Sequence, residues 1–122
     1  MSTGRIDVVT IFPEFFSSLE ISLIGRARAT GSLDVNVHDL REWTTDRHRS
    51  VDDTPAGGGA GMVMRADVWG KALDDVLTRG GPQHPATLII PTPGGEPFTQ
   101  RSAEVFAADL ARGEQLGIAC GR

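Results

Sequence analysis

The sequence predicts an α/β domain with a mainly parallel sheet, because strand-like and helix-like segments alternate along its 122 residues. Residues 6–12, IDVVTIF, are mostly apolar and β-branched, a pattern typical of a strand buried on both faces. Residues 66–77 instead carry apolar side chains at helical spacing. A chain of this length is expected to form one domain, and the sequence contains no internal repeat or linker.

Two short helices are expected after the first strand. Pro13 ends that strand and suits the first turn of a helix, where its missing N–H would have no partner in any case. A second helix is predicted over 22–29, with Ser22 as its N-cap and Gly31 as its left-handed terminator.

Residues 33–38 alternate between apolar and polar side chains, which indicates a second strand. Its apolar residues are expected to face inward and His38 to face solvent. The long segment 44–64 that follows is interpreted as a loop without secondary structure of its own. Such a loop is uncommon inside a compact domain unless it is functional or disordered.

The second half continues the alternation. The helix at 66–77 is broken by Gly-Gly-Pro, and residues 87–90 then form a short strand that is expected to be buried. A further helix should begin after Thr99 as N-cap and end at Gly113, because apolar residues recur at helical spacing between them. Residues 116–120 read as the last strand.

Composition excludes several classes of protein. No apolar run is long enough to span a bilayer and no secretory signal is evident, so we expect a cytoplasmic location without a membrane partner. The single cysteine, Cys120, cannot form an internal disulfide. The three histidines and this cysteine lack zinc-ligand spacing, and neither a dinucleotide-binding glycine motif nor a Walker-type loop is present. A net charge of -4 gives no general signal for nucleic-acid binding.

The strongest functional signal is the segment 44–64, TTDRHRSVDDTPAGGGAGMVM, where alternating acids and bases directly precede a cluster of glycines. Arginine offers forked donors that suit a phosphate or carboxylate, and glycine lets backbone N–H groups approach a ligand closely. The pattern therefore indicates a polar binding loop. The alternative is a charged surface loop with a mobile glycine hinge.

A second signal lies at two strand ends. The strand at 87–90 runs into Pro91–Gly95, and the strand at 116–120 runs into Gly121. Ligands of open α/β sheets bind beyond the carboxyl ends of the strands, where the backbone of such loops can hold them. A planar ligand held by main-chain groups is therefore predicted here. A tight turn and a strand-end glycine without function are the alternative.

Several motifs together resemble one family. The segments IFPEFF, ISLIGRARATG, DRHRSVDDTPAGGGAGMVM, PTPGG and ACGR, spread over nearly the whole chain, are similar to those of bacterial tRNA (guanine-37-N1)-methyltransferases. The resemblance implies a SPOUT-type fold with a deep trefoil knot. It also implies transfer of the methyl group of S-adenosylmethionine to N1 of the tRNA guanine just 3′ of the anticodon, by homodimers whose active sites lie between subunits.

The same resemblance implies roles for individual residues. Main-chain groups of two knot loops would bind the adenine and ribose of the cofactor, at Ile90, Pro91, Thr92, Pro93, Gly95 and Gly121. Residues near the target guanine and the tRNA would be Arg47, His48, Arg49, Asp52, Gly58 and Gly59.

Members of this family continue from CGR into a Tyr-Glu-Gly-Ile-Asp segment, a third knot loop, a linker and a helical domain that carries the general-base aspartate. That aspartate is therefore expected to lie beyond Arg122, and no catalytic residue is assigned within residues 1–122. These residues are expected to be the amino-terminal, cofactor-binding part, with the knot incomplete and without activity alone. Asp52 is expected to orient the substrate rather than to remove its proton.

Some questions stay open at this point. A requirement for a divalent cation cannot be read from the sequence. The alternatives to a methyltransferase are a non-catalytic RNA-binding or dimerisation module, and another α/β enzyme that binds a nucleotide at the PTPGG turn.

Overall fold

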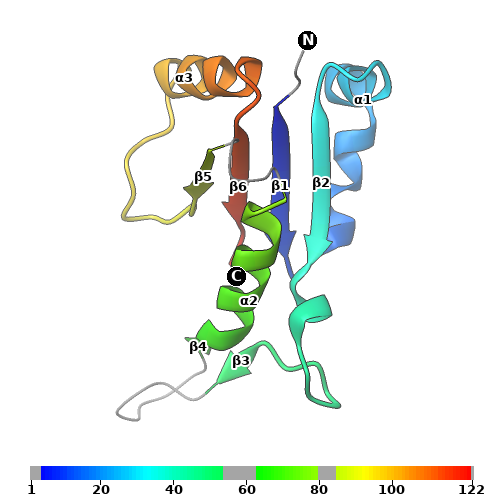
Figure 1. Cartoon of the computed structure of the whole chain (residues 1–122), viewed down its shortest axis with the longest axis vertical. Coiled ribbons are helices and arrows are strands. Elements are labelled where there is room, and N and C mark those ends of the chain that lie inside the picture. The colour runs from blue at the N-terminus through cyan, green and yellow to red at the C-terminus, as the bar shows by residue number, and fades with distance from the viewer. Residues whose placement is uncertain (1–3, 54–62, 80–84, 122) are drawn as a thin grey trace.

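The computed structural model describes residues 4–53, 63–79 and 85–121, and a four-stranded parallel sheet forms its centre. The strands are β1 (Arg5–Thr10), β2 (Asp34–Asp39), β5 (Ala86–Ile89) and β6 (Gln115–Ala119). They lie in the order β2-β1-β6-β5, and every neighbouring pair is parallel. The predicted α/β class with a parallel sheet is therefore confirmed (Figure 1). The trefoil knot stays a prediction.

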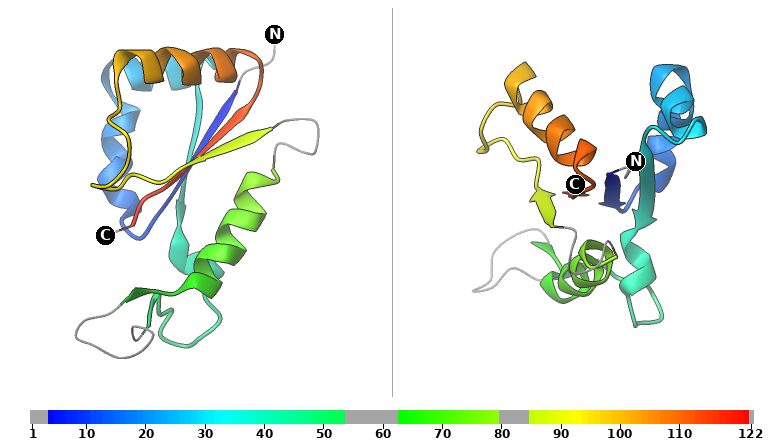
Figure 2. Two further views of the ribbon diagram at one scale, coloured as in Figure 1. Left: turned by 90° about the vertical axis from the view of Figure 1, so that its left-hand side faces the viewer. Right: turned by 45° about the horizontal axis from the view of Figure 1, so that its top comes forward.

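Helices cover both faces of this sheet (Figure 2). On one face lie the 3₁₀ helix η1 (Pro13–Glu20), α1 (Ser22–Ala29) and α3 (Gln100–Ala111), and on the other lies α2 (Ala66–Leu77). None of the helices within the described ranges is long and apolar enough to cross a bilayer. Covering both faces explains why successive residues of β1, from Asp7 to Thr10, are all buried.

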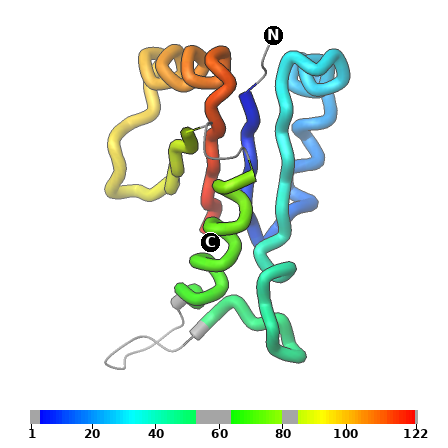
Figure 3. The backbone as a smooth tube through the Cα atoms, in the orientation of Figure 1, coloured from blue at the N-terminus to red at the C-terminus, as the bar shows by residue number. Residues whose placement is uncertain are grey.

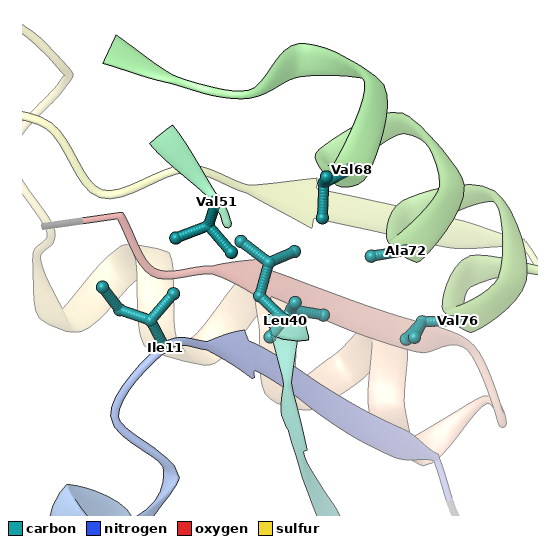
Figure 4. Close-up of a cluster of buried hydrophobic side chains, with 7 residues drawn as sticks. Ile11, Leu40, Val51, Val68, Ala72 and Val76 are labelled. Carbon is teal, nitrogen blue, oxygen red and sulfur yellow. The ribbon is translucent and has the colours of Figure 1, made fainter. Parts of the chain in front are cut away.

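The main core lies between the sheet and α2 (Figure 4). The 3₁₀ helix η2 (Leu40–Trp43) contributes Leu40, which is fully buried. Val51 also enters this cluster, although it belongs to the long segment after η2. The members of the cluster are Val9, Ile11, Leu40, Val51, Val68, Ala72 and Val76. Burial of Val51 therefore anchors the long segment to the domain, at about 1.5–3 kcal/mol for one aliphatic side chain.

Three predicted helix ends are confirmed and one is wrong. Gly31 and Gly113 have φ angles of +79° and +86°, the left-handed conformation expected of a terminator. Thr99 caps α3 by accepting a hydrogen bond from the Ser102 backbone N–H. Ser22, however, is not the N-cap of α1. The first helical hydrogen bond runs from Gly25 N–H to the Ile21 carbonyl, which places the cap at Ile21 and Ser22 inside the helix.

The expectation that the strand near 87–90 is buried is also wrong. β5 forms the edge of the sheet and pairs on one side with β6. Its residues Ala86, Thr87 and Leu88 are exposed. An apolar run predicts a buried strand only when neighbours cover both its faces and its free edge.

The segment 44–64 does contain secondary structure, contrary to the sequence-based expectation. β3 (Asp52–Asp53) pairs antiparallel with β4 (Val63–Met64) to form a small ribbon. We call residues 44–53 and 63–64 the arm. Figure 3 shows the backbone leaving η2, passing through the arm and returning into α2. The arm lies at the end of the sheet toward which the strands point (Figure 1).

Candidate functional site

The two segments predicted to bind a ligand follow neighbouring strands. We call Pro91–Gly95 the first tip and Gly121 the second tip. β5 and β6 are parallel and hydrogen-bonded, with Ile89 opposite Ile118. Their carboxyl ends therefore lie at the same end of the sheet, and they are followed by Pro91–Gly95 and Gly121. Ile90, Pro91, Thr92, Pro93 and Gly95 are all exposed, as is Gly121. The fold leaves the backbone of both tips accessible to a ligand.

The first tip is a turn closed by a hydrogen bond from Gly95 N–H to the Thr92 carbonyl, at 3.2 Å. The backbone conformation does not require glycine in this turn. Among the described glycines, positive φ angles occur at Gly31 and Gly113, not at the glycines of the turn. Packing does not require them either. A Cβ on Gly95 would lie 3.5 Å from the nearest atom, the Thr92 carbonyl oxygen, which is an ordinary contact.

The second tip has the same property. A Cβ on Gly121 would meet the Met64 Sδ at 3.7 Å, again an ordinary contact. The strand end itself is fixed, since Cys120 N–H donates to the Val9 carbonyl at 2.9 Å. Burial raises the pKa of the Cys120 thiol, which favours its neutral form and a packing role. Neither a tight turn nor packing within the described residues explains glycine at position 95 or 121.

The arm meets the second tip. Met64, the last residue of β4, stands opposite Asp52 in the β3–β4 ribbon, and its Sδ lies 3.7 Å from the position that a Cβ on Gly121 would occupy. Asp52 is thus one strand away from the residue whose side chain lies near the end of β6. Met64 therefore links two predicted site residues that are far apart in the sequence, since it pairs with Asp52 and its side chain lies near Gly121.

Some of the sequence-based predictions fall on residues that the structure does not describe. These residues are Gly58, Gly59 and Arg122. The two glycines therefore stay predicted substrate residues. The general-base aspartate expected beyond Arg122 likewise stays a prediction.

The DRHR motif forms a turn at the start of the arm. Arg49 N–H donates to the Asp46 carbonyl at 3.2 Å, and Ser50 N–H donates to both carboxylate oxygens of Asp46 at 3.0 and 3.1 Å. Arg47 and His48 occupy the middle of this turn and are exposed. They present a cation and an imidazole to solvent on the arm.

Arg41 joins this turn to the sheet. Its guanidinium Nη1 donates to the Ile11 carbonyl, just beyond β1, at 2.7 Å. Its own carbonyl accepts from the Thr44 hydroxyl at 2.6 Å and from the Arg49 Nε at 3.4 Å. Arg49 therefore turns back toward η2.

Sequence reasoning missed a buried polar cluster on the α2 face of the sheet. Asp7 is fully buried and accepts hydrogen bonds from Arg5 Nε and Gln115 Nε2, both at 2.7 Å, and lies 2.8 Å from His38 Nε2. Burial raises the pKa of Asp7, but the hydrogen bonds from His38, Arg5 and Gln115 outweigh it and lower that pKa to about 2. The sequence feature that could have indicated this cluster is Asp7 itself, a single charged residue within the mostly apolar segment 6–12.

His38 is consequently not the solvated residue that the alternating pattern suggested. It is 9% exposed, because its face of the sheet is covered by α2 and by Trp43, whose ring packs edge-on at 6.1 Å. Since Asp7 has no solvent exposure, this cluster stabilises the fold and is closed to a ligand. Within the described residues no group of three or more His, Cys, Asp or Glu side chains could hold a metal ion.

Comparison with known proteins identifies close relatives. A family model described as tRNA (Guanine-1)-methyltransferase TrmD matches residues 4–122. The chain is 59% identical, over 97% of its length, to the tRNA (guanine-N(1)-)-methyltransferase of Arthrobacter sp. (strain FB24), and covers 42% of that protein. The proteins of the same name from Salinispora tropica and Micrococcus luteus are 57% and 55% identical over 97% of the chain, which covers 44% and 51% of them. The chain thus spans about half the length of these relatives.

Proposed function

The chain belongs to the tRNA (guanine-1)-methyltransferase TrmD family, and from this premise we propose that it forms the cofactor-binding part of a tRNA (guanine-37-N1)-methyltransferase. The full-length protein transfers the methyl group of S-adenosylmethionine to N1 of guanine 37 in tRNA. Residues 1–122 supply the amino-terminal SPOUT domain, and further segments of the full-length protein complete a deep trefoil knot. Since tRNA is the substrate, we propose a cytoplasmic location.

The observation that carries the cofactor site is the pair of neighbouring tips with glycines that the fold itself does not need. A ligand that approaches the backbone closely supplies the missing reason for glycine. Main-chain groups of the two tips hold the adenine and ribose of S-adenosylmethionine, through Ile90, Pro91, Thr92, Pro93, Gly95 and Gly121. The bound group supplies an electrophilic methyl carbon on its sulfonium.

The arm receives the RNA. The Met64 side chain lies near Gly121, so the ribbon approaches the second tip, and the exposed Arg47 and His48 lie on the same arm. Arginine is suited to phosphate and base edges. Arg49, Asp52, Gly58 and Gly59 complete the proposed substrate set.

The reaction needs a base. As the N1–methyl bond forms and the sulfur–methyl bond breaks, the electron pair of that bond goes to sulfur and the N1 proton of guanine must go to a base. In the proposed mechanism Asp52 orients the guanine, and a carboxylate that follows Arg122 in the full-length protein takes the proton. Holding the guanine in line with the methyl group is the larger contribution of this chain. We propose a homodimer with the active site between subunits.

Calorimetry and a methylation assay on the full-length protein test this function. We expect binding of S-adenosylmethionine and of its demethylated product, and methyl transfer to a tRNA transcript with guanine at position 37 but not to one with adenine there. RNA binding without cofactor binding would instead favour the non-catalytic module. Binding of a nucleoside triphosphate in place of S-adenosylmethionine would favour a different α/β enzyme.

A further inference from the structure

Asp46 closes the DRHR turn with both its backbone carbonyl and its side-chain carboxylate. Its backbone carbonyl accepts from Arg49 N–H, and its carboxylate accepts from Ser50 N–H through both oxygens. These bonds give the carboxylate a backbone partner within its own turn. In the part of the chain that the structure describes, Asp46 makes no ion pair with an arginine. An aspartate that bonds the backbone in this way fixes the conformation of the residues between.

Arg49 adds a second fixed point. Its φ angle is +51°, a left-handed conformation that is rare for arginine and persists only when its surroundings stabilise it. The stabilising contacts are the Arg49 N–H bond to Asp46 and the Arg49 Nε bond to the Arg41 carbonyl. Arg41 in turn bonds to the Ile11 carbonyl at the end of β1. The turn is therefore tied to the sheet at its end.

The side chains of the two central residues do not help to hold the turn. Arg47 and His48 are exposed, and no hydrogen bond or ion pair engages either side chain within the described ranges. The motif therefore divides into two residues that build the turn, Asp46 and Arg49, and two that are presented by it. Presenting side chains from a fixed turn lowers the conformational entropy lost when a partner binds.

We propose that Asp46 is a positioning residue for the RNA substrate, which acts by holding the 46–49 turn so that Arg47 and His48 meet the tRNA. This inference rests on the proposed function. The Asp46 carboxylate keeps its negative charge when it accepts from the Ser50 N–H, and that charge would not itself attract RNA phosphates. Asp46 thus contributes through geometry rather than through its charge.

The test compares three variants of the full-length protein in the methylation assay. Asp46→Ala removes the acceptor and is expected to raise the KM for tRNA by about fivefold to tenfold, the usual effect of losing such a local acceptor. The KM for S-adenosylmethionine should stay the same. Asp46→Asn keeps an oxygen acceptor for Ser50 N–H without the charge and should restore the tRNA KM to within about threefold of wild type. Glu42→Ala removes the same charge from an exposed position of η2 and should change neither constant.

Two results would overturn the proposal: an unchanged tRNA KM in Asp46→Ala, or an Asn variant as impaired as the Ala variant. If the wild-type protein does not methylate tRNA, the proposed function itself fails. Amide hydrogen exchange tests the turn without substrate. Ser50 N–H should be protected in the wild-type protein, and a Ser50 amide that exchanges as fast as an unstructured one would exclude the positioning role even if Asp46→Ala does not fold.

Discussion

The imidazole Nε2 of His38 lies 2.8 Å from the buried Oδ1 of Asp7, although 31 positions separate the two residues in the sequence. The other carboxylate oxygen accepts from Gln115 Nε2, which also donates to the Val76 carbonyl of α2 at 2.8 Å. Asp7 therefore joins the three strands β2, β1 and β6 to the helix that covers them. The cluster therefore stabilises the arrangement of the strands and of α2, from which the arm and the two tips extend.

Replacing Asp7 should destabilise the protein strongly. Asp7→Ala leaves the buried His38 and Gln115 and the partly exposed Arg5 without their common partner, and breaking a buried pair in this way costs about 3–5 kcal/mol. We expect a loss of this size in the free energy of unfolding, measured by urea denaturation of the full-length protein. Asp74→Ala, an equivalent change on the exposed side of α2, should alter it by less than about 0.5 kcal/mol. Equal effects of the two substitutions would mean that the Asp7 cluster is not a main source of stability.

The same carboxylate predicts a pH dependence. The pKa of Asp7 is lowered from an ordinary value of 3.8 to about 2 in the folded protein, so the folded state binds this proton less readily than the unfolded state. Its stabilising contribution is therefore complete above pH 3.8 and is lost as the pH falls toward 2, by about 2 kcal/mol in all. Urea titrations between about pH 5 and pH 2 should show a steeper fall in wild type than in Asp7→Asn. Parallel curves would contradict the assignment of this titration to Asp7.

Local sequence patterns predicted most elements of the fold. Two examples are the apolar spacing of α2 and the end signals of α3 at Thr99 and Gly113. These signals depend only on neighbours in the chain, so they can be recognised from the sequence alone. His38 is different. Alternation placed it opposite Val35, but whether that opposite face is exposed depends on α2, which follows much later in the sequence.

The candidate site divides in the same way. The residues of the tips could be chosen from the sequence because parallel strands end at one edge of a sheet. The approach of Met64 to Gly121 could not be predicted from the sequence, since it depends on how the arm folds relative to β6. The role of Asp46 was equally hidden, because a charged residue in a charged motif gives no sign that its partner is a backbone N–H.

Adding one methyl group to the second tip should separate ligand binding from folding. Gly121→Ala meets its nearest neighbour in the chain at an ordinary contact distance, so we expect a change in unfolding free energy below about 0.5 kcal/mol. Against a bound cofactor the same methyl group would overpack the site by about 1–3 kcal/mol, which corresponds to binding that is weaker by about fivefold to 150-fold. Calorimetry with S-adenosylmethionine measures the affinity.

Gly70→Ala supplies the matched control. Gly70 lies inside α2 with no atom within 4 Å of its added Cβ, so alanine should stabilise the helix by about 0.5–1 kcal/mol and leave cofactor affinity unchanged. If Gly121→Ala binds S-adenosylmethionine as tightly as wild type, the backbone of this tip does not contact the cofactor.

The exposed turn predicts a specific salt dependence. If Arg47 contacts a tRNA phosphate, Arg47→Ala should reduce the slope of log affinity against log salt concentration by about one. Arg101→Ala removes the same charge from an exposed position on α3, at the end of the sheet away from the arm (Figures 1 and 2), and should leave the slope unchanged. Filter binding or fluorescence anisotropy over a series of salt concentrations gives both slopes. An equal reduction in the two variants would indicate that RNA responds only to total charge, whereas a reduction confined to Arg47→Ala assigns the phosphate contact to the turn that Asp46 holds.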